Sequence, residues 1–247
     1  MINLKRIICI MFIAVSVSSS VCPATPDRPE TKRTEMKTIG LISGISWTSS
    51  IEYYRMMNEL VMKRLGGLHS AKIIMYSVEF GEFSRRERLA DKGDWKPLID
   101  IMVDAARRLE IAGADFIVIC SNTMHSAVDD IKANVKIPVI HIRDLTIKKV
   151  KERGITTVAV LGTKYTMENL YNDTDELYEK YGVKVVVPNP SERIYINNVI
   201  FDELCANKIT SDSREGYKKI INRLIKEDGG PGRGLGLYGD TAFDKTE

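Results

Sequence analysis

Short apolar runs rich in β-branched residues alternate with longer amphipathic segments along most of this chain. The runs have the length of buried strands, and the longer segments have the period of surface helices. Alternation of this kind predicts a parallel sheet with right-handed crossovers. The expected strands are 38–41, 73–78, 116–119, 139–142, 157–161 and 183–187. The expected helices are 49–65, 94–112, one ending near 134, 147–153, 167–181, 191–205 and 213–227, and residues 79–93 are expected to form a polar loop.

Two of the expected strands end in a glycine loop that opens a helix. Residues 38–41 lead into Ser43-Gly44-Ile45-Ser46-Trp47, and residues 157–161 lead into Gly162-Thr163. The repetition predicts two similar α/β halves that face each other across a cleft. We place the first domain at 36–142 and the second at 143–227. Neither loop has the spacing G-x-G-x-x-G, so a dinucleotide site is not expected.

The first 35 residues differ from the rest of the chain. Lys5 and Arg6 precede an apolar run at 7–17, which is typical of a signal peptide, so 1–22 is expected to be a leader and 23–35 a disordered linker. A real leader predicts an exported or periplasmic protein. The alternative is a cytoplasmic protein that starts at Met36. No segment after residue 35 is long enough to span a membrane.

Composition excludes several classes of function. A net charge of +3 on 247 residues is too small to indicate nucleic-acid binding. Four cysteines without a C-x-x-C pair and three scattered histidines give no zinc pattern, so no metal is expected.

The stretch around Cys120 carries the strongest chemical signal. The apolar run 116–119 stops at this cysteine, and Ser121, Asn122 and Thr123 follow. The carboxyl end of a parallel strand is where ligands bind, and a helix N-terminus there favours a thiolate. The three polar residues could also donate hydrogen bonds to a carboxylate. The alternative is an inert buried cysteine before an ordinary helix cap, and the spacing alone leaves both interpretations open.

Several motifs together resemble the aspartate/glutamate racemase family, over about Met36 to Lys226. These motifs are Gly40 to Trp47 (Gly-Leu-Ile-Ser-Gly-Ile-Ser-Trp), Glu52-Tyr53-Tyr54, Gly67 to Ser70, Cys120 to His125 (Cys-Ser-Asn-Thr-Met-His) and Leu161-Gly162-Thr163. The first loop departs from the family, which more often has Gly-Gly-Met-Ser, and Thr48 replaces a usual Glu. These departures leave the chemistry of the loop similar but bear on the choice of substrate.

The resemblance implies an α/β fold of two similar doubly wound parallel-sheet domains, with the active site in the cleft between them. It also implies an amino-acid racemase without a cofactor, in which one cysteine from each domain serves one face of the substrate Cα. Racemisation needs a base and an acid on opposite faces, and thiols suit both roles. By resemblance, Cys120 is one of the two. Ser46, Ser121, Asn122 and Thr123 would bind the substrate, with Thr163 facing them. His125 would either tune Cys120 electrostatically or simply pack.

The expected partners are a small amino-acid or dicarboxylate substrate and, as a possible assembly, a second copy of the chain. No nucleic acid and no integral membrane span after leader removal are expected.

The second cysteine motif of the family, a strand followed by Gly-Cys-Thr-Glu, is missing. Residues 228–247 stand in its place, and five glycines and a proline between 229 and 236 argue against a buried strand there. We therefore expect the second domain to be incomplete. Cys205 lies late in an expected helix and is assigned to packing.

A shift of reading frame would explain the tail. The codons permitted for Gly229 to Thr246, read one base later, allow Gly-Ala-Gln-Gly-Val-Ala-Leu-Gly-Cys-Thr-Glu-Ile-Pro-Leu-Leu-Ile-Lys-Gln, which contains the missing motif. The cysteine falls where Leu237 is written. The alternative is a divergent tail.

Three functions remain open on the sequence. The first is a racemase of aspartate or glutamate, impaired here. The second is a related hydantoin racemase, maleate isomerase or decarboxylase on the same scaffold. The third is a non-catalytic remnant that binds a small carboxylate.

Overall fold

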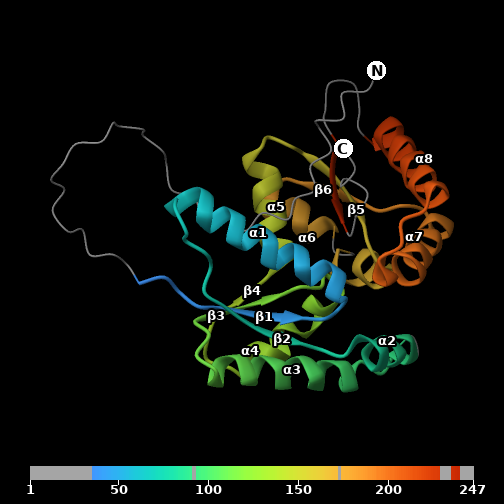
Figure 1. Cartoon of the computed structure of the whole chain (residues 1–247). Coiled ribbons are helices and arrows are strands. Elements are labelled where there is room, and N and C mark those ends of the chain that lie inside the picture. Colours follow the sequence, from blue (N-terminus) through green and yellow to red (C-terminus); the bar gives the residue numbers. More distant parts are fainter. Residues whose placement is uncertain (1–34, 91–92, 172–173, 229–234, 240–247) are drawn as a thin grey trace, which may run out of the picture.

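Two parallel β-sheets form the centre of the protein (Figure 1). The computed structural model describes residues 35–90, 93–171, 174–228 and 235–239. The first sheet has the order β2-β1-β3-β4, and its strands are β1 (Ile39–Ser43), β2 (Ile73–Ser77), β3 (Phe116–Ile119) and β4 (Val139–Ile140). The second sheet has the order β6-β5-β7, with β5 (Thr157–Leu161), β6 (Lys184–Val186) and β7 (Leu235–Gly239). Every strand pair is parallel, which confirms the predicted α/β fold class.

Helices cover both sheets (Figure 1). They are α1 (Trp47–Leu65), α2 (Phe80–Leu89), α3 (Lys96–Ile111), α4 (Val128–Lys132), α5 (Ile142–Glu152), α6 (Thr174–Tyr181), α7 (Pro190–Asp202) and α8 (Ser211–Asp228), with short helical turns η3 (Thr123–Ala127), η4 (Thr166–Leu170) and η5 (Leu204–Ala206). Within the described part of the chain, no helix combines the length and apolar character that a membrane crossing requires.

The first sheet buries different residues on its two faces. On one face α1 places Tyr53 and Met57 against Leu41, Val118 and Cys120. On the other face, Ile42, Ile117 and Ile119 pack against α3 and α4. Because successive strand residues point to opposite faces, Cys120 lies on the α1 side of the sheet.

The second sheet is centred on β5, whose five residues are all buried. Its core combines Val158 and Val160 with Tyr171, Ile196 and Tyr217 from the surrounding helices. Helix α5 follows β4 of the first sheet and leads to β5 of the second, so one helix connects the two halves.

The predicted loop at 79–93 is wrong over α2. Glu79 caps this helix by accepting hydrogen bonds from the backbone N–H groups of Gly81 and Glu82. Glu82 pairs with Arg85 and Arg86 one turn later, and Phe83 is fully buried. Phe80 and Phe83 among mostly charged residues give too short an apolar period, and for this reason the pattern indicated a loop.

The expectation that the tail contributes no strand is also wrong. Residues Leu235–Gly239 form β7, and Leu235 pairs with Thr157 while Gly239 pairs with Leu161. Sheet pairing uses backbone N–H and C=O groups, which glycine retains, and β5 would otherwise have an unpaired edge. The second sheet therefore has a third strand in the sequence as written.

The observed ends of the other helices and strands differ from the predicted ends by a few residues. The helix expected at 167–181 is divided into η4 and α6. The leader 1–22 and nearly all of the linker 23–35 lie outside the described residues.

Gly44 ends β1 at a point where the chain passes very close to its neighbour. Its φ is +86°, and a Cβ there would lie 2.3 Å from the carbonyl oxygen of Val78 and 2.6 Å from its nitrogen. Backbone atoms cannot move aside without breaking the bond from the Val78 N–H to the Ser43 carbonyl. The loop therefore requires glycine for its conformation and for the space.

We expect Gly44→Ala to lower the free energy of unfolding by at least about 2 kcal/mol more than Gly66→Ala does. Gly66 is a matched control because its φ is also positive, +75°, while nothing lies within 4 Å of a Cβ there. Urea unfolding of both variants measures the difference. Equal losses would mean that the contact with Val78 imposes no constraint.

Candidate functional site

Cys120 lies directly after β3, at the carboxyl end of the first sheet. Its backbone N–H donates to the carbonyl of Ile42 on β1, at 2.8 Å. The hydroxyl of Ser49, on the first turn of α1, donates to the carbonyl of Cys120 at 3.3 Å. The cysteine is thus held beside the glycine loop, as the sequence predicted.

The thiol of Cys120 is buried, with 1% of the residue exposed. This burial raises the pKa of the Cys120 thiol well above its ordinary value, because a thiolate would lose its hydration. The sequence suggested the opposite, since a helix N-terminus follows. That helix, η3, is a short turn of five residues, and the cause of the shift is desolvation of the thiol. In this conformation the thiol is neutral.

Several hydroxyl groups lie in and just after the glycine loop that follows β1. The Gly44 N–H donates to the hydroxyl of Ser50 at 2.9 Å, and that hydroxyl donates to the carbonyl of Ser46. The side chain of Ser46 is itself buried and lies 2.5 Å from the hydroxyl of Thr48. Thr48 stands where the family usually has Glu. Its hydroxyl therefore orients Ser46, a residue predicted to bind the substrate.

Three buried threonines join the two halves of the protein. The hydroxyl oxygen of Thr123, on η3, lies 2.9 Å from that of Thr163 and 3.3 Å from that of Thr166. The hydroxyls of Thr163 and Thr166 are 3.2 Å apart, and the Thr166 N–H donates to Thr163. We call this set the threonine triangle. Its three hydroxyls hydrogen-bond one another in the absence of a ligand.

The threonine triangle brings together two predicted residues and one that the sequence analysis missed. Thr123 and Thr163 were expected to face each other, and they do. Thr166 was not singled out, although it is fully buried. The Thr163 hydroxyl accepts from the Thr166 N–H as an N-cap does, but the sequence gave no signal for the contact of Thr166 with Thr123.

Ser121 and Asn122 begin the turn after the cysteine. The Ser121 hydroxyl accepts from the Met124 N–H at 3.4 Å, and the Asn122 carbonyl accepts from the His125 N–H at 3.1 Å. Asn122 is buried, while Ser121 is half-buried. Both lie between Cys120 and the threonine triangle along the chain.

His125 is buried and hydrogen-bonded to this same turn. Its Nδ1 lies 2.7 Å from the carbonyl oxygen of Ser121, which can only accept, so Nδ1 carries the proton. Burial, and then the neighbouring ring of His141 at 5.2 Å, lower the pKa of His125 to about 3. A neutral imidazole offers no positive charge to a thiolate. The geometry instead makes His125 a residue that fixes the position of the turn.

Helix α2 and Trp95, the residue before α3, both contact the second half at Tyr165. Tyr165, next to Thr166, stacks edge-on against Trp95 with 5.0 Å between ring centroids. Its hydroxyl donates to the backbone carbonyl of Glu87 at 3.5 Å, and Glu87 is itself almost completely buried. The sequence gave no indication of these contacts, because α2 was expected to be a loop.

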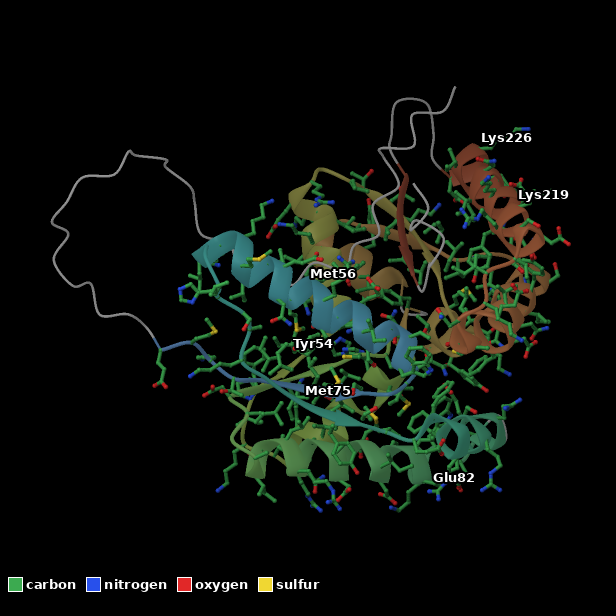
Figure 2. The ribbon with its side chains drawn as sticks, in the orientation of Figure 1. Tyr54, Met56, Met75, Glu82, Lys219 and Lys226 are labelled. Carbon is green, nitrogen blue, oxygen red and sulfur yellow. The ribbon has the colours of Figure 1, made fainter. Side chains whose placement is uncertain are left out.

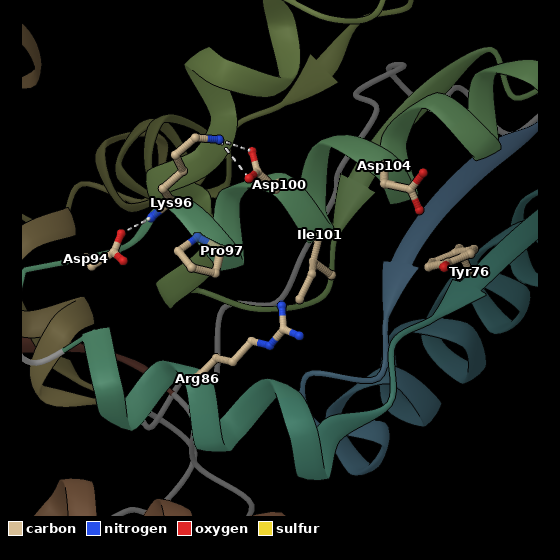
Figure 3. Close-up of a pocket in the computed structure, with 8 residues that line it drawn as sticks. All are labelled: Tyr76, Arg86, Asp94, Lys96, Pro97, Asp100, Ile101 and Asp104. Atoms are coloured by element: carbon tan, nitrogen blue, oxygen red, sulfur yellow. Dashed lines mark hydrogen bonds and ion pairs between the residues drawn. The ribbon is translucent and has the colours of Figure 1, made fainter.

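A groove of about 520 Å³ lies on the other side of the first sheet, between α2, α3 and β2 (Figure 3). Lys96 at its rim pairs with Asp100, and Arg86 pairs with Glu82. Tyr76 in its wall belongs to the face opposite Cys120. The groove is therefore separate from the residues predicted to bind the substrate.

Candidate metal ligands do not gather in the described ranges, where no three His, Cys, Asp or Glu side chains form a group. Cys205, in η5, packs against the core of the second half rather than at a strand end.

We expect the protein to lose stability as the pH falls below about 6.5, because the folded state favours neutral His125 and unfolding frees it to bind a proton. Stability from this group is present above pH 6.5 and declines toward pH 3. The free energy of unfolding changes by about 1.4 kcal/mol per pH unit for one such histidine. His125→Gln should reduce the slope of the unfolding free energy between pH 6 and pH 4.

His69→Gln is the control, because His69 is exposed. An unchanged slope in His125→Gln would contradict the assignment of a buried neutral imidazole.

Solved structures share this architecture. The crystal structure of a protein from Yersinia pestis, described as a putative Asp/Glu racemase, is 45% identical to this chain and has a TM-score of 0.67. The match covers 78% of this chain and 82% of that one. An aspartate racemase homologue from Pyrococcus horikoshii OT3 is 32% identical with a TM-score of 0.63, over 81% of this chain and 85% of the other. Among curated proteins, the broad specificity amino-acid racemase RacX of Bacillus subtilis (strain 168) is 27% identical over 134 residues.

That match with RacX covers 53% of this chain and spans 56% of the length of RacX, a little over half. The sequence model of the Asp/Glu/hydantoin racemase family matches residues 42–231, which include both glycine loops, Cys120 and the threonine triangle. The chain therefore belongs to the Asp/Glu/hydantoin racemase family.

Proposed function

We propose that this protein is a cofactor-independent amino-acid racemase of aspartate or glutamate, with Cys120 as the acid/base group on one face of the substrate Cα. The observation that carries the proposal is the position of Cys120 at a strand end, one turn before a hydroxyl cluster that both halves build. Hydroxyl and backbone N–H donors of this kind suit an α-carboxylate.

The chemistry follows from these groups. A carboxylate that enters the threonine triangle replaces the bonds among its three hydroxyls with bonds to itself. Thr163 and Thr166 come from the second half, so substrate binding draws on both sheets. Ser46 and Ser121 line the first half of the same region. Hydrogen bonds to the carboxylate stabilise the negative charge that spreads onto it when Cα loses its proton.

The protonation state of Cys120 depends on the contact between the halves. Burial favours the neutral thiol, and water that enters with the substrate relieves this desolvation, so that the thiol can lose its proton to water. A bound substrate ammonium then favours the thiolate. The thiolate sulfur takes the α-proton, and the electron pair of the C–H bond passes to the α-carboxylate. The Cys120 thiol then exchanges its proton with water, and return of this solvent-derived proton to the same face of Cα gives exchange without inversion.

Inversion needs a second acid on the opposite face. The described residues contain two cysteines, and Cys205 packs in the second core. We therefore propose that this chain is impaired in racemisation. A single thiol also suits a decarboxylase, which protonates one face only, and release of carbon dioxide would identify that alternative.

Cys120→Ala should reduce exchange of the substrate α-proton with deuterium by at least about 10²-fold. Loss of the Hα signal of aspartate and glutamate in deuterium oxide, followed by NMR, measures it. Cys205→Ala is the matched control and should exchange at the parent rate. Undiminished exchange in Cys120→Ala would show that another group is the base.

The position of β7 bears on the hypothesis that the tail is translated in a shifted reading frame. Strand β7 runs parallel to β5, so its carboxyl end lies at the same sheet edge as Gly162 and Thr163. The cysteine of the shifted frame falls at Leu237, which pairs with Ala159 in the middle of β7, two residues before the carboxyl end. The support for the proposal that residues from about 228 replace an ancestral strand and cysteine motif is therefore the place of this segment beside β5, and not the register of position 237.

Replacing residues 229–246 with the shifted-frame string should produce interconversion of D- and L-aspartate or glutamate, and raise it by about 10²–10⁴-fold over the chain as written. The control is the same replacement with alanine in place of its cysteine. Equal turnover by the chain as written and by the replacement would contradict the frameshift hypothesis and return attention to Cys205.

Localisation and assembly remain proposals. We propose export through the leader 1–22, with a cytoplasmic start at Met36 as the alternative. A homodimer is the assembly we favour.

A further inference from the structure

The groove between α2, α3 and β2 has the size of a small-molecule site (Figure 3). Its volume of about 520 Å³ lies within the range of roughly 300–1,000 Å³ that ligand pockets have. Its walls carry two cations, Arg86 and Lys96, three aspartates, and the apolar surfaces of Pro97 and Ile101. The groove lies on the face of the first sheet opposite Cys120, so the reaction proposed at Cys120 does not use it.

Arg86 on α2 presents the end of its guanidinium to the groove. Its Nε donates to Glu82 at 2.8 Å, and its two terminal NH₂ groups have no hydrogen-bond partner among the described residues. Figure 3 shows the guanidinium between α2 and α3, pointing toward Ile101. Paired N–H groups in this fixed fork match the two oxygens of a carboxylate. The groove therefore has an anchor for one carboxylate group.

Asp94, two residues before α3, is the aspartate of the groove that has no ion pair within the described part of the chain. Its Oδ1 accepts from the backbone N–H of Lys96 at 3.2 Å. The side chain of Asp100 pairs with the Lys96 ammonium at 2.7 Å. Asp104 pairs with Arg108, also at 2.7 Å. The second carboxylate oxygen of Asp94 is thus available to a cationic group of a ligand.

The charges of the groove decide which class of ligand it can hold. Three acids and two cations line it, so one negative charge is in excess. A phosphate or a dicarboxylate would add to this excess, and a diamine would place a cation beside the Arg86 guanidinium. A zwitterion with one carboxylate and one ammonium satisfies Arg86 and Asp94 together and adds no net charge. Pro97 and Ile101 supply the apolar wall that an aliphatic side chain needs.

We propose that this groove binds a free amino acid with an aliphatic side chain. The Arg86 guanidinium donates to its α-carboxylate, the α-ammonium donates to Asp94, and the side chain lies against Pro97 and Ile101. Aspartate and glutamate, the substrates proposed for the site at Cys120, are excluded from the groove by the negative charge of their side chains. Because the ligand is small and the groove is open to solvent, we expect a Kd of about 1 mM.

The position of the groove connects it to the contact between the two halves. Helix α2, which carries Arg86, also carries Glu87, whose backbone carbonyl accepts from the Tyr165 hydroxyl at 3.5 Å. Asp94 directly precedes Trp95, whose ring packs edge-on against Tyr165. A ligand that joins Arg86 to Asp94 therefore links the two segments on which Tyr165 of the second half packs. Occupation of the groove stabilises this contact.

The test is a titration of the full chain with L-leucine, followed by saturation-transfer NMR of the ligand. Arg86→Gln should weaken binding by at least about tenfold, because it removes the charged anchor of the carboxylate. Arg85→Gln is the matched control and should bind as the parent does. Arg85 lies on the same helix and also pairs with Glu82, but its side chain is 70% exposed and does not line the groove.

Ligand analogues test the two anchors without relying on the fold of a variant. 4-Methylpentanoate lacks the ammonium of leucine and 3-methylbutylamine lacks the carboxylate, so each should bind the parent chain at least about tenfold more weakly than leucine. In Asp94→Asn, leucine and 4-methylpentanoate should bind equally. Binding of both analogues as tight as that of leucine would overturn the proposal.

The site at Cys120 is separated from the groove by a further variant. Thr163→Val changes the proposed substrate site and should leave leucine binding unchanged. Loss of leucine binding in Thr163→Val, with retention in Arg86→Gln, would place the ligand near Cys120 and overturn the proposal. A parent chain that does not bind leucine would overturn it as well, while leaving the proposed racemase chemistry untouched.

Discussion

The parallel pairing of β1 with β3 is the constraint on which the rest of the site depends. The bond from the Cys120 N–H to the Ile42 carbonyl fixes the end of β3 beside the glycine loop that follows β1. In a parallel sheet both strands release their loops at the same edge. The close approach of Gly44 to Val78 then sets the path of the first loop. The Gly44 N–H donates a hydrogen bond to the hydroxyl of Ser50. One ladder of backbone bonds thereby places Cys120 and Ser46 in one region.

Burial explains the electrostatics of this region. Cys120 and His125 are both removed from water, and burial shifts each pKa toward the neutral form, upward for the thiol and downward for the imidazole. The threonine triangle closes the contact between the halves with hydroxyls that satisfy one another. These hydrogen bonds satisfy the buried hydroxyls within the protein itself.

Helix α1 packs against the site from one face of the first sheet (Figure 2). It begins directly after Ser46, and Ser49 on its first turn bonds the carbonyl of Cys120. Its buried face covers the cysteine with Tyr53 and Met57.

The sequence by itself determined the α/β class, most of the strands and the position of Cys120 at a strand end. Buried parallel strands are continuous apolar runs, and the break at Cys120 marks the edge. Only the tertiary structure decided the rest. Helix α2 has too few apolar residues for a period, and β7 forms because β5 offers unpaired backbone groups to a glycine-rich segment. Thr166 and the neutral state of His125 depend on contacts between segments far apart in the chain, and local pattern carries no information about desolvation.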